Sequence, residues 1–132
     1  MKNSMFILHL AVALILLSHA LPGMFDGGIH SFGQDYLNQI GFAPIGVPLA
    51  WAIKLSHVAC AILLVANKWI KPAALLTIAI LVMGIILVHF KEGWFVVGGG
   101  RNGVEYNFLL ICVLVAIMLN NKTKTATDQS QR

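Results

Sequence analysis

The sequence predicts an all-α integral membrane protein, a single bundle of four spanning helices with both termini in the cytoplasm. Composition is the first reason: 58% of the 132 residues are hydrophobic and 11% are charged, whereas soluble domains carry about 25% charged residues. The second reason is four apolar runs, each near the ~20 residues that a helix needs to cross a bilayer. The third is an uneven distribution of lysine and arginine among the connections, which sets the orientation.

The four apolar runs divide the chain into one membrane domain, residues 1–119, and a polar tail, residues 120–132. The runs lack the alternation of polar and apolar residues that marks barrel strands. Because backbone polar groups in hydrocarbon need internal partners, each run is expected to be a helix. The expected spans are residues 5–21, 47–66, 72–90 and 104–119.

Proline and glycine mark the expected helix ends. Pro22-Gly23 is predicted to end the first helix, because proline cannot continue the backbone hydrogen bonding and glycine permits a left-handed cap. Pro48 and Pro72 fall in the first turns of the second and third helices, where a missing N–H costs little. The stretch VVGGGRNG, residues 96–103, is predicted to stop helical structure before the fourth run.

The first run has a second interpretation. Lys2, a short apolar core and the residues SHA before Leu21 resemble a cleavable signal peptide. An uncleaved first helix is the simpler arrangement, because three further apolar runs follow it. Cleavage is the alternative.

Residues 22–46 form a long connection with a pattern of its own. In the stretch SFGQDYLNQIGF, apolar side chains recur at Phe32, Tyr36, Leu37 and Ile40, which share one face of a helix. A short helix lying in the membrane interface is therefore predicted here. An irregular loop with scattered aromatic residues is the alternative.

Positive charges place the termini. Four spans put both termini on the same side of the membrane as the short 67–71 connection. That side carries Lys2, Lys68, Lys71, Lys122, Lys124 and Arg132. The opposite side carries Lys91 and Arg101. The positive-inside rule then assigns both termini to the cytoplasm, and the 22–46 and 91–103 connections to the outer face of a cell inner membrane. The polar tail is predicted to be disordered.

Several ionisable side chains lie within the apolar runs, where they are costly and therefore indicate a role. Lys54 and His57 are three residues apart and share a helix face. Because the chain crosses back and forth, the outer ends of all four helices are expected to gather, and these side chains should meet near the outer face. The predicted ligand-binding residues are His19, Lys54, His57, His89, Trp94 and Glu105.

Structural roles are an alternative for these residues. Lys54 and Glu105 could form a buried ion pair that fixes helix register. A tryptophan at a span end is often an interfacial anchor, and a terminal histidine often has a water or carbonyl partner. His9 lies near the cytoplasmic side and is expected to be separate from the others.

The sequence argues against several classes of function. No HxxxH or ExxH pair occurs within one run, and Cys60 and Cys112 lack CxxC partners, so no metal site is predicted. The net charge of +4 resides in connections and tail without a basic stripe, which argues against nucleic-acid binding. No catalytic residue is identified, and enzymatic activity is left open.

The succession of segments over residues 5–119 resembles the DoxX family of small four-helix bacterial membrane proteins. The stretch HFKEGWFVVGGGRNGVEYNFLL is similar to that family's histidine, glycine-aromatic-phenylalanine, glycine-rich bend and glutamate-aromatic opening of the last helix. YLNQIGFAPIGVPLAWA resembles the approach to the second helix, and NKWIKPAALLTIAILV resembles the second connection and third helix. The matching positions in the first stretch are His89, Gly93, Trp94, Phe95, Gly99, Gly100, Gly103, Glu105 and Tyr106.

The resemblance implies a membrane subunit of an oxidoreductase or redox-stress system, because family members resemble a subunit of thiosulfate:quinone oxidoreductase. A quinone or another small redox ligand would bind near the outer face, no cofactor would be intrinsic, and a soluble or membrane partner would carry electrons. The chain departs from the family in its second helix, where Lys54, Ser56 and His57 stand in place of a frequent glutamate.

Two alternatives to a redox subunit follow from the same residues. A non-enzymatic scaffold or assembly factor would use the polar groups only to specify helix packing. A small carrier would line a path with Lys54 and His57, although carriers usually show inverted repeats. The expected partners are the lipid bilayer and a redox subunit, and a thin bundle of four short helices is compatible with a homodimer.

Overall fold

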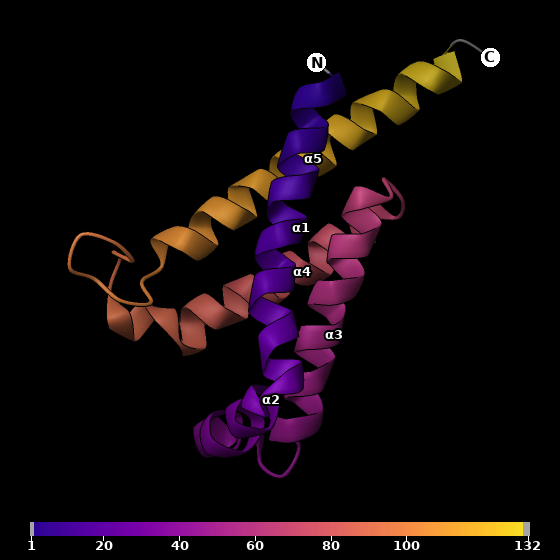
Figure 1. The fold of residues 1–132 in the computed structure, drawn as a ribbon. Helices are drawn as coiled ribbons and strands as arrows, with labels where there is room; N and C mark the ends of the chain where they lie inside the picture. The colour runs from indigo at the N-terminus through magenta and orange to yellow at the C-terminus, as the bar shows by residue number, and fades with distance from the viewer. Residues whose placement is uncertain (1, 131–132) are drawn as a thin grey trace. The chain divides into compact units, whose positions relative to one another are not determined.

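The chain folds into helices throughout its regular structure. A computed structural model describes residues 2–130, with side chains for residues 4–121, and no strand occurs in that part of the chain (Figure 1). The all-α prediction is confirmed. The elements are α1 (Lys2–Phe25), α2 (Gly28–Ser31), η1 (Phe32–Phe42), α3 (Gly46–Val65), α4 (Ile70–Leu87), η2 (His89–Glu92) and α5 (Glu105–Ser130).

Three helical segments are long and apolar enough to cross a membrane: Ser4–Phe25, Gly46–Val65 and Ile70–Leu87. α5 contributes a shorter apolar segment, Glu105–Asn121. Many large apolar side chains on these helices are exposed, as lipid contact requires; examples are Phe6, Ile7, Leu14, Leu55, Ile62, Leu75, Leu76 and Ile86. The chain is thus a multi-pass membrane protein with lipid-facing helices, and a fourth span stays a prediction.

The chain comprises two compact units. One contains His9–Lys68, and the other contains Met1–Leu8 together with Trp69–Arg132. The first unit therefore holds most of α1 with α2, η1 and α3, and the second holds α4, η2 and α5. Each unit is described by itself below.

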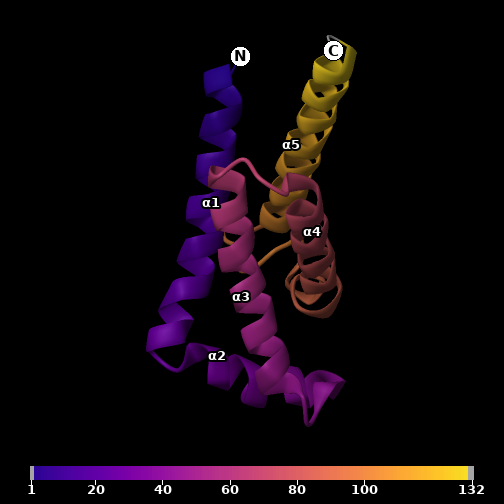
Figure 2. The same ribbon diagram turned by 90° about the vertical axis from the view of Figure 1, so that its right-hand side faces the viewer.

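In the first unit, α1 and α3 are antiparallel neighbours held at two levels by polar contacts (Figure 2). His9 Nδ1 lies 3.0 Å from the carbonyl oxygen of Leu64, and Lys54 Nζ donates to the carbonyl oxygen of His19 over 3.0 Å. Between the two contacts both helices advance ten residues in opposite directions, about 15 Å at ~1.5 Å per residue. The two contacts therefore fix one register along the helix pair.

The predicted short helix within residues 22–46 is confirmed. α2 and η1 lie crosswise to α1 and α3 at one end of the unit (Figure 2). η1 is of the wide π type, whose i→i+5 hydrogen bonding brings residues four and five apart onto one face. That face packs on α3. The apolar cluster between them has a buried centre with partly buried side chains around it: Ile29, Leu37 and Ala50 at the centre, and Met24, Phe32, Tyr36, Ile40, Phe42, Leu49 and Ile53 around it. The predicted apolar face of this helix thus contacts protein, and its position at a membrane interface stays a prediction.

The start of α3 depends on a close approach to η1. A Cβ on Gly33 would lie within clash distance of Val47, and a Cβ on Gly46 would meet both the Gly33 carbonyl and the Asn38 side chain. Asn38 Oδ1 accepts the N–H of Gly46 over 2.8 Å. Since the first N–H groups of a helix have no partner within it, Asn38 satisfies one of these donors from outside. Two glycines and an asparagine therefore define this corner.

The predicted end of the first helix is wrong. α1 continues through Pro22 to Phe25, one turn further than expected. Proline removes only one N–H, and with Pro22 so close to the helix end the carbonyl of Pro22 itself still accepts the N–H of Asp26 over 3.2 Å. A proline in the last turn is therefore tolerated, whereas the sequence rule assumed that it stops the helix.

The expected starts of the other spans agree with the structure to within two residues, whereas α5 continues to Ser130, beyond the expected end at residue 119. α3 begins one residue before the expected residue 47 and ends one residue before the expected residue 66, and Pro48 lies in its first turn. α4 has Pro72 in its first turn and ends at Leu87, and His89 and Phe90, which were expected to complete the span, belong to the 3₁₀ turn η2. α5 begins at Glu105, one residue after the expected 104.

In the second unit, α4 and α5 are joined by the loop that follows η2 (Figure 1). Asn107, which is buried, donates from Nδ2 to the carbonyl oxygen of Leu81 over 3.3 Å and so ties the start of α5 to α4. α5 runs on to Ser130, beyond its apolar segment. The side chains after residue 121 and all of residues 131–132 lie outside the described part, so the predicted disorder of the 120–132 tail stays a prediction.

Candidate ligand-binding site

The six predicted site residues fall into two groups of three. His19, Lys54 and His57 belong to the unit His9–Lys68, and His89, Trp94 and Glu105 belong to the unit that contains α4 and α5. In the first group Lys54 contacts the His19 carbonyl, and in the second group the Glu105 N–H contacts the Trp94 carbonyl. The prediction that all six line one pocket stays a prediction.

Lys54 lies eight residues after the start of α3 and is half-buried. Its Nζ donates to the His19 carbonyl and stands 5.6 Å from the centroid of the Phe32 ring. An ammonium over an aromatic face is attracted by the ring quadrupole. The charge of Lys54 is therefore solvated by a helix carbonyl and a ring from η1, and these contacts link α1, η1 and α3.

His57 is the unusual residue of this group. It is 8% exposed, and neither ring nitrogen has a hydrogen-bond partner among the described residues. Lys54 lies three residues before it, on the same face of α3. Buried polar atoms are nearly always hydrogen-bonded in native proteins, and an exception calls for an explanation. His57 therefore has hydrogen-bonding capacity that the described residues do not use.

His9 provides a contrast within the same helix pair. It is 7% exposed, like His57, but its Nδ1 lies beside the Leu64 carbonyl. A carbonyl oxygen only accepts, so Nδ1 carries the proton and donates. His9 therefore has a structural role, in line with its predicted separation from the site residues. His19 contributes its backbone carbonyl to the group, and its own side chain is exposed.

Glu105 forms a clip for the loop between η2 and α5. Its Oε1 accepts the N–H of Val96 over 2.6 Å and the N–H of Val97 over 3.2 Å. Backbone bonds close the same loop, from the Val104 N–H to the Gly93 carbonyl and from the Glu105 N–H to the Trp94 carbonyl. Hydrogen bonds to a carboxylate are about twice as strong as neutral ones. Glu105 therefore holds its own loop.

His89 holds the other side of this loop. Its Nδ1 lies 2.5 Å from the Asn102 carbonyl, so Nδ1–H donates and a neutral ring leaves Nε2 as an acceptor. Trp94 packs beside Phe108 of α5, with ring centroids 5.6 Å apart. Lys54 and Glu105 thus both have backbone partners within their own units, and neither depends on the ion pair that the sequence left open.

The glycine-rich bend is required by steric fit. A Cβ on Gly100 or Gly103 would collide with the Phe95 carbonyl, because the backbone passes over itself here. Only glycine allows so close an approach. The bend predicted from the three consecutive glycines is therefore a packed loop that brings Val96 and Val97 to the Glu105 carboxylate.

Two polar residues with structural roles were missed by sequence reasoning. Asn38 satisfies the first N–H of α3, and Asn107 joins α5 to α4. An asparagine within the apolar run VEYNFLL was the available signal for Asn107, since a neutral amide in a spanning segment needs a partner as much as a charge does. Nothing in the pattern around Asn38 pointed to Gly46.

Among the described residues, no group of three or more His, Cys, Asp or Glu side chains is arranged to hold a metal ion. Cys60 is buried in α3 and Cys112 is exposed on α5, and neither forms a disulfide. The donors available to a ligand are therefore imidazole nitrogens, an ammonium and backbone groups. Comparisons with protein-family models, with curated proteins and with solved structures find no match for this chain.

Proposed function

We propose that this chain is a membrane subunit of an oxidoreductase or redox-stress system, and that it binds a quinone or a related small redox ligand at His57. The observation that carries the proposal is the pair of unpartnered nitrogens on a buried histidine. The DoxX resemblance supports the same class of function. The proposed arrangement has four spans, with α5 as the fourth, and both termini on the cytoplasmic side of an inner membrane.

The chemistry of a quinone suits His57 and Lys54. A neutral imidazole offers one N–H donor and one acceptor nitrogen, and an ammonium offers donors only. A quinone carbonyl would accept from the His57 ring and from Lys54, whereas a hydroquinone hydroxyl would donate to the ring. Both redox forms of one ligand could therefore bind in an otherwise apolar site with few polar groups, as is usual for small-molecule sites.

The proposal uses the binding groups of this chain and assigns electron transfer to a partner subunit. The contribution of this chain would be to hold the ring of the ligand by hydrogen bonds at the His57 nitrogens and at Lys54.

The test is mass spectrometry of small molecules bound to gently extracted full-length protein, compared with two variants. His57→Leu should lose the bound quinone, and Lys54→Met should weaken its binding by about tenfold, since one lost hydrogen bond to a charged group is worth about 1.4 kcal/mol or more. His9→Leu is the matched control, because it alters a buried histidine of the same helix pair whose nitrogen is bonded. Equal quinone content in His57→Leu and wild type would refute the proposal.

A non-enzymatic scaffold is the second candidate, and one observation favours it. Glu105 and His89 both bind their own loop, as residues do when they shape a surface. The two candidates differ in their sensitivity to substitution. A scaffold would lose its partner subunit in Glu105→Gln or His89→Ala and keep it in His57→Leu, whereas the redox subunit would lose its ligand in His57→Leu.

A further inference from the structure

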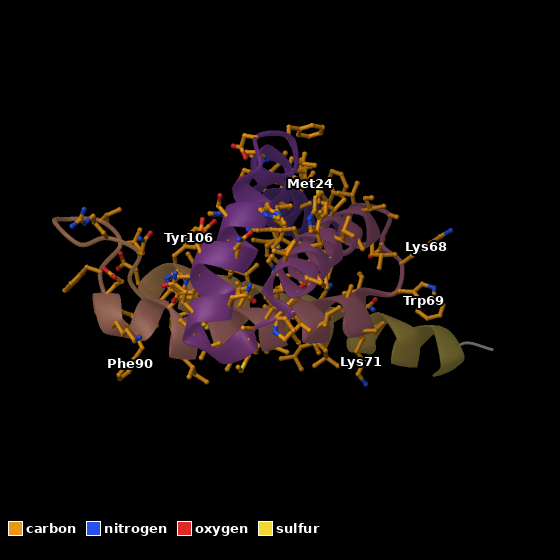
Figure 3. All side chains as sticks on the ribbon, turned by 90° about the horizontal axis from the view of Figure 1, so that it is seen from below. Met24, Lys68, Trp69, Lys71, Phe90 and Tyr106 are labelled. Carbon is orange, nitrogen blue, oxygen red and sulfur yellow. The ribbon has the colours of Figure 1, made fainter. Side chains whose placement is uncertain are left out.

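The segment of residues 88–104, which contains η2 and the loop that joins it to α5, exposes apolar side chains from a fixed backbone. Phe90 is 75% exposed, Phe95 62%, Val97 71% and Trp94 48%. Phe90 points away from the ribbon (Figure 3). The Glu105 and His89 contacts hold the backbone that carries them. The exposure is therefore a property of an ordered loop.

Such a surface is unfavourable in water. An aromatic side chain buries about 150–250 Å² of surface when it is covered. Each Å² of apolar surface removed from water is stabilising by ~25 cal/mol. Two exposed cations, Lys91 and Arg101, belong to the same segment, residues 88–104, and its one exposed acid is Glu92. The covering surface should therefore be apolar and lined with negative charge.

The opposite end of α4 shows the same combination. Trp69, which is 77% exposed, stands between Lys68 and Lys71, and all three side chains point away from the ribbon (Figure 3). α4 has 18 residues, about 27 Å at ~1.5 Å per residue, close to the ~30 Å of a bilayer's hydrocarbon core. Aromatic residues and cations thus mark both ends of one membrane-length helix, as they do at membrane–water interfaces.

We infer that the loop formed by residues 88–104 is a preformed lipid anchor, whose aromatic side chains enter the bilayer interface while Lys91 and Arg101 contact phospholipid phosphate. The Glu105 clip sets its shape. This role is independent of the ligand proposed at His57, because it involves none of the same residues.

The test reads the depth of Trp94 by fluorescence in lipid vesicles. The chain has three tryptophans, so Trp51→Phe with Trp69→Phe leaves Trp94 alone. In vesicles of phosphatidylcholine and phosphatidylglycerol with bromine on the upper acyl chain, Trp94 should lose more than half of its emission, and aqueous acrylamide should have little effect.

Two further variants test the parts of the anchor. Bromine carried on phosphatidylglycerol should quench Trp94 more than bromine on phosphatidylcholine, and Lys91→Gln with Arg101→Gln should abolish that difference. Glu105→Gln should make Trp94 more accessible to acrylamide, and Glu92→Gln, which leaves the clip intact, should not.

Trp94 emission typical of water, without quenching by lipid, would overturn the inference. Shielding from both lipid and acrylamide would overturn it too, by showing a protein or second copy over the loop, and equal quenching by the two lipids would refute the role of the cations.

Discussion

At the scale of single residues, two histidines on neighbouring helices show how burial and partnership differ. His9 and His57 are almost equally buried, yet only His9 has a hydrogen bond. The sequence identified both as ionisable groups in apolar runs and placed them at different depths, but it did not show that only His9 would have a hydrogen-bond partner. The partners of His9, Lys54 and His89 are backbone carbonyls. Every residue has a carbonyl, so no residue pattern reveals which one a side chain will reach.

The unpartnered nitrogens of His57 predict a gain in stability when the ring is replaced. A buried polar group without a partner costs about 1–3 kcal/mol, so His57→Leu should raise the unfolding free energy of the ligand-free protein by that order. His9→Leu should show no such gain, because it removes a hydrogen bond. Detergent-induced unfolding followed by circular dichroism measures both. A His57→Leu protein less stable than His9→Leu would show that the ring has a partner.

At the scale of helices, the sequence predicted existence and type well and packing partners poorly. Apolar length and proline placement predicted α3 and α4 to within a few residues at each end, and the misplaced ends are those of α1, after Pro22, and of α5. The face of η1 was predicted, but its contact with α3 was not, because an apolar stripe fits lipid and protein equally well. The antiparallel register of α1 and α3 lies in two long-range contacts that local patterns do not encode.

That register predicts a specific cross-link. Counting from the His9–Leu64 and His19–Lys54 contacts places Val12 level with Ala61, and both residues are buried. Val12→Cys with Ala61→Cys, in a protein with Cys60→Ala and Cys112→Ala, should form a disulfide on mild oxidation, visible as a mobility shift on a gel. Ala11→Cys with Ala61→Cys is the control, since Ala11 is exposed on another face of α1. Equal cross-linking in both pairs would contradict the register.

At the scale of the whole molecule, composition alone gave the class of protein. A chain with 11% charged residues has too few charges to form a solvated surface. In agreement with this, three of its helical segments are apolar and long enough to cross a membrane. The candidate site was less predictable. Its residues were found because charges in apolar runs are conspicuous, but their grouping depends on which helices pack together, and that is decided by side-chain fit over many residues.

The number of crossings has a direct test. If α5 spans through its apolar segment Glu105–Asn121, both termini share the side rich in lysine, as the positive-inside rule predicts. A fluorescent protein fused after residue 132 should then be bright in the cytoplasm, and alkaline phosphatase inserted in the 88–104 loop should be active. Phosphatase activity at the C-terminus, with a dark fluorescent fusion, would mean that α5 does not cross.

The contact between Asn38 and the first N–H of α3 has a consequence for biosynthesis. Asn38 is eight residues upstream of Gly46, and synthesis proceeds from the N-terminus, so the acceptor leaves the ribosome before the helix that it starts. η1 therefore acts as a template, and α3 can begin at its native residue as soon as it emerges. In a nascent chain that lacks residues 28–42, α3 would begin at a different residue. Lys54 and His57 would then lie at a different distance and angle from the start of the helix.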